Sequence, residues 1–168
     1  KKSGLAIFMA GWSPPRTRFD PTRSPYEYND FLKSTWGIGV KSDYLVLKFG
    51  PARDDPSLKY PMIHSQQNQF MLADEAFELT DHEITKPLQT SPVGLDAVCP
   101  LELPVAGSQP AGVKISPIVE VPKSEDLWAF SNLERIDKDI QAKRGTICYP
   151  DDLKSPFPIA VAASNDQN

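Results

Sequence analysis

Two apolar runs lie near opposite ends of the chain. Leu5–Ala10 and Pro158–Ala163 are each six residues long and contain no charged or hydroxyl side chain. Such runs are typical of strands buried on both faces, as in the centre of an α/β sheet. The three alanines of the second run indicate that another element, which we expect to be a helix, packs closely against it. We therefore expect the two runs to lie side by side inside one layered sheet.

A helix is expected after the first run, beyond a proline-rich loop over 11–25. Apolar and aromatic side chains recur at spacings of three and four residues from Tyr28 to Trp36, which predicts one largely apolar face. Ser24 suits the N-cap, and Gly37 suits the left-handed residue that ends a helix. A strand over 44–49 follows.

The rest of the chain predicts short elements, because its 17 prolines interrupt helices and strands. We expect a strand over 98–103 and a broken strand over 113–121, near a sheet edge because of Pro117. Residues 81–88 predict one or two helical turns. Ser131 and Glu134 fit a capping box ahead of a helix that ends at Gly145.

These elements favour one α/β domain over 1–168, a layered sheet flanked by helices. The net charge is −4 and the basic residues are scattered, which argues against a nucleic-acid surface. No apolar stretch approaches the ~20 residues of a membrane-spanning helix, and no signal peptide is recognisable. The abrupt start at Lys1 leads us to expect a soluble piece of a longer protein.

His82, between Asp81 and Glu83, is the first candidate for chemistry. A carboxylate neighbour can orient an imidazole or share a metal ion, but a metal site needs three or four ligands, and no other His or Cys is close in sequence. The pattern favours a structural role, with the ring packed and one nitrogen bonded to the backbone. We expect no metal and no cofactor.

Cys99 or Cys148 could act as a nucleophile with His82 as the base, as in a hydrolase or an amidotransferase. Such a nucleophile stands on a sharp turn flanked by glycines, whereas prolines follow both cysteines closely. Two buried, unreactive thiols are the alternative. The glycines of Gly37-Ile38-Gly39 follow a helix instead of a strand, so they predict helix closure and not a phosphate loop.

Two surface hypotheses concern binding. Arg16, Arg18 and Arg23 lie in the loop after the first strand and could contact an anion or an acidic partner. Trp12 and Trp128, if exposed along a groove, would instead favour a carbohydrate- or peptide-binding surface domain, because aromatic faces stack on such ligands.

The order of several short segments resembles one family. Trp36-Gly37-Ile38 leads from a helix into a strand, His82-Glu83-Ile84-Thr85 lies mid-chain, Ser124–Trp128 follows the proline-broken strand, and Pro156–Ala163 closes the pattern. Together they resemble the auxiliary domain of GldG-type ABC transport systems, which is similar to the GIFT domain of intraflagellar-transport proteins. The family more usually has proline where Glu83 stands, and the first part of its domain would precede Lys1.

The resemblance implies a flavodoxin-like or amidotransferase-like α/β domain without catalytic residues. It also implies a parent protein anchored in the membrane beside an ABC-2 type permease and an ATPase, with this domain outside the cytoplasm, in the periplasm. We therefore expect a non-catalytic accessory domain of an export or gliding-motility system that acts by protein or ligand contact. Its contact residues are expected to be the three loop arginines with Asp81 and His82. The thiol enzyme and the surface binding domain are the alternatives.

Overall fold

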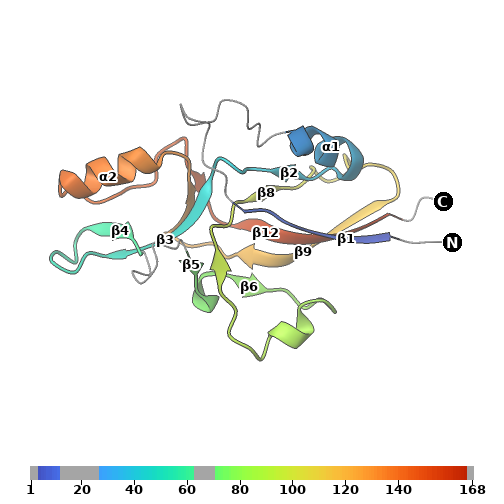
Figure 1. Cartoon of the computed structure of the whole chain (residues 1–168), viewed down its shortest axis with the longest axis horizontal. Coiled ribbons are helices and arrows are strands. Elements are labelled where there is room, and N and C mark those ends of the chain that lie inside the picture. Colours follow the sequence, from blue (N-terminus) through green and yellow to red (C-terminus); the bar gives the residue numbers. More distant parts are fainter. Residues whose placement is uncertain (1–3, 12–26, 63–70, 166–168) are drawn as a thin grey trace.

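The computed structural model describes residues 4–11, 27–62 and 71–165. Over these residues the chain forms two α-helices and many short strands, and all the strand pairings between them are antiparallel (Figure 1). The two larger sheets have four strands each, and two smaller sheets have two strands each.

The first sheet has the order β1-β12-β9-β6. Its strands are β1 (Gly4–Met9), β12 (Phe157–Asn165), β9 (Val113–Val121) and β6 (Glu78–Leu79). The register pairs Ile7 with Ala162, so strands from the two ends of the chain lie side by side. β12 is central and its residues 159–163 are nearly inaccessible to solvent. The uninterrupted apolar sequence of this strand matches burial on both faces.

The second sheet has the order β11-β10-β3-β4. Its strands are β11 (Leu153–Lys154), β10 (Leu127–Phe130), β3 (Leu45–Pro51) and β4 (Lys59–Pro61). All four residues of β10 are buried, because apolar layers cover both of its faces.

The small sheets pair β2 (Gly39–Val40) with β8 (Leu101–Glu102) and β5 (Met71–Leu72) with β7 (Leu95–Asp96). The α-helices are α1 (Glu27–Trp36) and α2 (Leu133–Gln141), and single 3-10 turns form η1 (Asp74–Ala76) and η2 (Lys86–Leu88).

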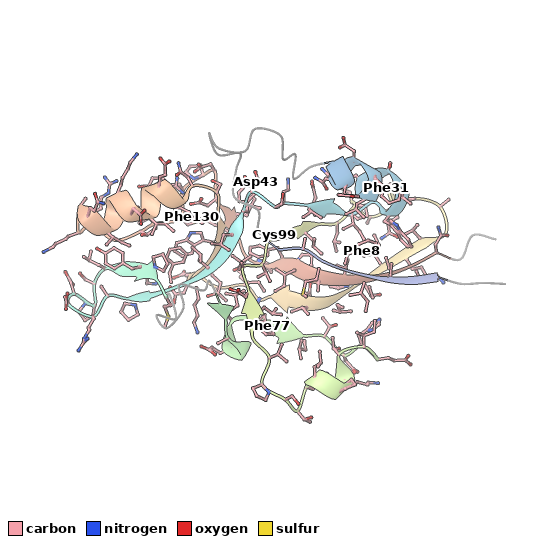
Figure 2. The ribbon with its side chains drawn as sticks, viewed as in Figure 1. Phe8, Phe31, Asp43, Phe77, Cys99 and Phe130 are labelled. Atoms are coloured by element: carbon pink, nitrogen blue, oxygen red, sulfur yellow. The ribbon has the colours of Figure 1, made fainter. Side chains whose placement is uncertain are left out.

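The core has three apolar clusters in layers. Val46 and Ala129 of the second sheet meet Val121 and Ile159 of the first sheet in the largest cluster. A second cluster lies on the other face of the second sheet, where Ile136 of α2 covers β3 and β10. The third cluster lies on the other face of the first sheet, under β2, β8 and the end of α1. Figure 2 shows Phe130 of the second cluster beside α2 and Phe8 of the third cluster on the side of α1.

The predicted α/β architecture, a layered flavodoxin-like or amidotransferase-like sheet flanked by helices, is wrong. The protein is β-rich, and its strands pair in antiparallel fashion. A parallel strand pair needs a crossover, usually a helix of ten or more residues that packs on the sheet. Here α1 leads into the two-residue β2, and β3 then joins a different sheet from β1. The strand–helix–strand order in the sequence therefore does not produce a βαβ unit.

One expectation about sheet position is also wrong. β1 is an edge strand, and Ile7 and Met9 are 55% and 57% exposed. β9 is continuous and not broken as predicted, but β6 pairs with it only opposite Val119 and Glu120. Pro117 therefore lies where the outer side of β9 has no strand partner among the described residues, as expected of a proline near a sheet edge. Its carbonyl oxygen faces that side and accepts a hydrogen bond from the hydroxyl of Thr80 at 2.8 Å.

The predicted end of the first helix is confirmed, whereas α2 ends at Gln141 and not at the predicted Gly145. α1 ends at Trp36, and Gly37 follows at a positive φ of 73°, as expected of a closing glycine. The N-cap of α2 is Asn132 and not the predicted Ser131: the Asn132 side chain accepts a hydrogen bond from the Arg135 amide. Ile38 and Leu101 lie in the cluster that contains Ala163, so β2 and β8 cover much of the face where a helix was expected.

Candidate functional site

The segment around His82 forms a closed turn. Nδ1 of His82 accepts a hydrogen bond from the amide of Ile84 at 3.2 Å. The hydroxyl of Thr85 lies 2.5 Å from the carbonyl oxygen of Thr80 and 3.0 Å from that of His82. Thr85 is 1% exposed, so these bonds satisfy a buried hydroxyl. The predicted structural role of His82, one ring nitrogen bonded to the backbone, is confirmed.

Asp81 does not orient the imidazole of His82. Its carboxylate is largely exposed and lies 3.8 Å from the ammonium group of Lys86. Within the described ranges, no group of three or more His, Cys, Asp or Glu side chains is arranged to hold a metal ion. The side chains of Asp81 and His82 therefore have different partners, although the two residues are adjacent in sequence.

The two cysteines are free thiols in different surroundings. Cys99 is fully buried, and its Sγ lies 3.3 Å from the carbonyl oxygen of Ala10. Burial raises the pKa of this thiol to about 12, and the negative charge of Asp43 adds to the effect. Figure 2 shows Cys99 in the middle of the molecule, with Asp43 nearby. Such a thiol carries almost no thiolate at neutral pH, and only the thiolate is a nucleophile.

Cys148 is partly exposed and packs against the second cluster. Burial raises the pKa of its thiol, Asp152 raises it further, and Lys154 opposes this. Over the described residues, no hydrogen bond joins either thiol to the His82 ring. The arrangement that a Cys–His enzyme requires, a nucleophile within hydrogen-bond reach of its base, is therefore not formed by these side chains.

The other predicted contact residues fall in two groups. Arg16, Arg18, Arg23 and Trp12 lie outside the described residues. Trp128 is 4% exposed, and its indole stacks on Phe49 with ring centroids 3.6 Å apart. A buried tryptophan cannot offer an open face to a sugar ring, so this observation opposes the surface-binding alternative.

Two cavities bring together residues that the sequence analysis did not select. The larger, about 760 Å³, lies between α2 and the β3–β4 connection, where Tyr60 and Ile140 line it with Arg53 and Lys143. The second, about 500 Å³, lies beside β10 and β11 and includes the partly exposed Cys148. Their lining residues come from segments far apart in sequence, so no local motif marks them.

Comparisons with protein-family models, with curated proteins and with solved structures find no match to this chain. Among the described residues, no helix has both the length and the apolar character needed to cross a membrane. The interpretation of function therefore depends on the geometry of the side chains and on the resemblance given above.

Proposed function

We propose that this chain is a non-catalytic accessory domain of an ABC-2 type export or gliding-motility system, as the resemblance to GldG-type auxiliary domains implies. It would act outside the cytoplasm by contact with other proteins or with a ligand. Its partners would be the permease and the ATPase of that system, and membrane attachment would come from segments of the parent protein outside these 168 residues.

The proposal is supported by the structural roles of the residues in the family-like segments. Gly37 ends α1, and its amide donates to the carbonyl oxygen of Lys33 at 3.0 Å. Thr85 and His82 hold one turn together through hydrogen bonds to the backbone. Ala160 to Ala163 form the buried centre of β12. Residues with these tasks shape a scaffold, and binding proteins present contact residues on loops that such a scaffold positions.

The thiol chemistry supports the same choice. A hydrolase or an amidotransferase with a cysteine nucleophile lowers the pKa of its thiol by means of a neighbouring base or cation. Here burial raises the pKa of both thiols, and to about 12 for Cys99. We therefore do not carry the thiol enzyme forward as a second candidate function.

The experiment first looks for genes of an ABC-2 type permease and an ATPase beside the gene of the parent protein, and then tests co-purification of the full-length parent with both subunits. All three would be co-expressed in membranes, with the affinity tag on the permease. We expect the parent to elute with both subunits at a fixed ratio, and a parent that lacks residues 1–168 to lose that ratio. Equal recovery of the truncated parent, or a parent that never elutes with the permease, would overturn the proposal.

The thiol-enzyme alternative is tested separately by removing both cysteines. The double variant C99A/C148A retains a permease contact that does not need a nucleophile, provided that its melting temperature stays close to that of the wild type. A transport or hydrolytic activity that disappears in this folded double variant would assign a catalytic task to a thiol.

A further inference from the structure

The smaller of the two cavities described above has a wall made by neighbouring residues of β10 and β11. Trp128 pairs with Lys154 in the register of these antiparallel strands, so both side chains leave the same face of the sheet side by side. Both residues line the cavity, together with Leu127 and Cys148. A volume of about 500 Å³ lies in the range of cavities that hold small molecules.

The positive charge of this cavity has no internal partner. Lys123 and Lys154 both line it, and neither ammonium group forms an ion pair within the described part of the chain. Lys154 lies near enough to the Cys148 thiol for its charge to oppose the rise in the pKa of that thiol. Two unpaired cations at the wall of a partly open cavity attract an anion, and they do so more strongly than isolated lysines on a flat surface.

Glu125 also lines the cavity. Its carboxylate is close enough to Lys59 to raise the pKa of that ammonium group, although Asp126 has the larger effect. Lys59 is already paired with Asp126, so the negative charge of Glu125 counts in full. The lining side chains include two lysines against one glutamate, and this net positive charge favours an anionic ligand.

A buried donor in the same wall lacks an acceptor. Trp128 is 4% exposed, and its indole Nε1–H has no hydrogen-bond partner in the described ranges. A buried N–H without an acceptor costs on the order of 1–3 kcal/mol. This nitrogen has no surface open to solvent, so the indole forms part of the wall and the ligand does not reach its N–H. Phe49 covers one face of the ring, so the ligand does not need to stack on an open indole face.

The rim of the cavity is held in place before any ligand enters. The hydroxyl of Ser155 accepts a hydrogen bond from the amide of Ser124 at 2.9 Å and donates to the Ser124 carbonyl oxygen at 3.1 Å. Both serines line the cavity. Their reciprocal bonds tie the β9–β10 connection to the end of β11, which lowers the cost of ordering the site on binding.

We propose that this cavity binds a small organic carboxylate, with the carboxylate between Lys123 and Lys154 and the apolar body beside Trp128 and Cys148. The inference concerns a ligand site and does not depend on the transport role proposed above. An organic anion fits better than an inorganic one because apolar side chains share the wall with the two lysines.

Benzoate is the first probe, and its neutral relative benzamide is the control. Spectra of ¹⁵N-labelled protein resolve the indole N–H of each tryptophan, and Trp128→Phe assigns the signal of Trp128. We expect benzoate to shift this signal saturably and benzamide to bind at least about fivefold more weakly, the effect of one lost charge pair. The double variant K123M/K154M should weaken benzoate to a similar degree, and K138M, on the exposed face of α2, should not.

An unmoved Trp128 signal at about 20 mM benzoate would overturn the proposal, because a ligand of millimolar affinity is nearly saturating there. If benzamide binds with the same affinity as benzoate, the two lysines do not select for a negative charge and the proposal is wrong. Equal binding of inorganic phosphate would show a general anion site and overturn the organic part of the proposal.

Alkylation of Cys148 gives a second readout that needs no tryptophan variant. Peptide mapping separates Cys148 from Cys99 after reaction with iodoacetate or iodoacetamide, and the ratio of the two rates cancels the thiolate fraction. We expect the rate with iodoacetate divided by the rate with iodoacetamide to be higher in the folded protein than in urea. The same ratio should fall in K123M/K154M, and benzoate should slow both reactions. A ratio equal to that of the unfolded chain, without protection by benzoate, would contradict the proposal.

Discussion

Nη2 of Arg135 lies 2.7 Å and 2.6 Å from the two carboxylate oxygens of Asp152. The Asp152 side chain is fully buried, and it also accepts a hydrogen bond from the amide of Tyr149. The guanidinium lies between the rings of Phe130 and Tyr149, 4.4 Å and 3.9 Å from their centroids. This pair fastens α2 to the segment that leads into β11, and thereby to one side of the proposed carboxylate site.

Removal of Arg135 is therefore expected to destabilise the whole domain. Arg135→Ala leaves the Asp152 carboxylate buried without its cation, which typically costs about 3–5 kcal/mol. Urea unfolding followed by circular dichroism measures the loss. Lys138→Ala on the same helix is the matched control and should change the free energy of unfolding by less than about 0.5 kcal/mol. A similar small change for Arg135→Ala would show that the pair contributes little to stability.

The edge position of β1 predicts a contrast between two isoleucines. Ile7 is 55% exposed and Ile159 is fully buried. Ile159→Ala should cost about 2–5 kcal/mol, because it leaves a cavity in the largest cluster, whereas Ile7→Ala should cost about 1 kcal/mol or less. The free energies of unfolding of the two variants give the comparison directly. Equal losses would place β1 inside the sheet, as the sequence pattern suggested.

Alanine substitutions at Gly37 and Gly107 distinguish the cost of backbone strain from the cost of steric overlap. Gly37 and Gly107 both have positive φ, 73° and 86°. A Cβ on Gly37 would lie 2.9 Å from Pro110 Cδ and 3.3 Å from Pro104 Cγ, whereas a Cβ on Gly107 meets nothing within 4 Å. Gly107→Ala should therefore cost about 1–2 kcal/mol from strain alone. Gly37→Ala should cost more, as measured by thermal unfolding, and a smaller loss than for Gly107→Ala would rule out the overlap.

The buried thiol of Cys99 predicts a loss of stability in alkali. Its pKa rises from an ordinary value of 9.0 to about 12 on folding, so the folded state holds its proton at a pH where the unfolded state has released it. The unfolded state is favoured by this difference, and the free energy of unfolding falls as pH rises from 9 toward 12, by about 1.4 kcal/mol per pH unit at most. Below pH 9 the thiol has no such effect.

Urea unfolding of the wild type and of Cys99→Ala at pH 8 and pH 10 tests this sign. The variant loses packing at both pH values, but its stability should fall less between them. If the two proteins lose the same stability from pH 8 to pH 10, the Cys99 thiol titrates in the folded state as it does in the unfolded chain.

Local signals in the sequence located several elements well. Tyr28 to Trp36 with the glycine that follows predicted α1 and its end, because helix spacing and a left-handed closing residue act over a few neighbouring positions. The apolar run near the C-terminus predicted the buried strand β12 for the same reason. The shift of the α2 cap from Ser131 to Asn132 is a change of one residue between two side chains that both suit an N-cap.

The candidate site was less accessible to sequence reasoning. The structural use of His82 was predicted because its neighbours offered no other ligands. The cavity beside Trp128 was not predicted, because Lys123 and Lys154 lie in different segments and are brought together only when β10 pairs with β11. Isolated lysines carry no pattern that marks a binding site.

The amino-acid sequence by itself determined which segments are apolar enough to be strands and where α1 ends. Only the tertiary structure decided that those strands run antiparallel, that β1 lies at an edge and that two cations share one cavity wall. The physical reason is that apolar spacing reports how a segment is buried, whereas strand direction and order depend on hydrogen bonds between segments far apart in the chain. An apolar run has the same spacing in either direction.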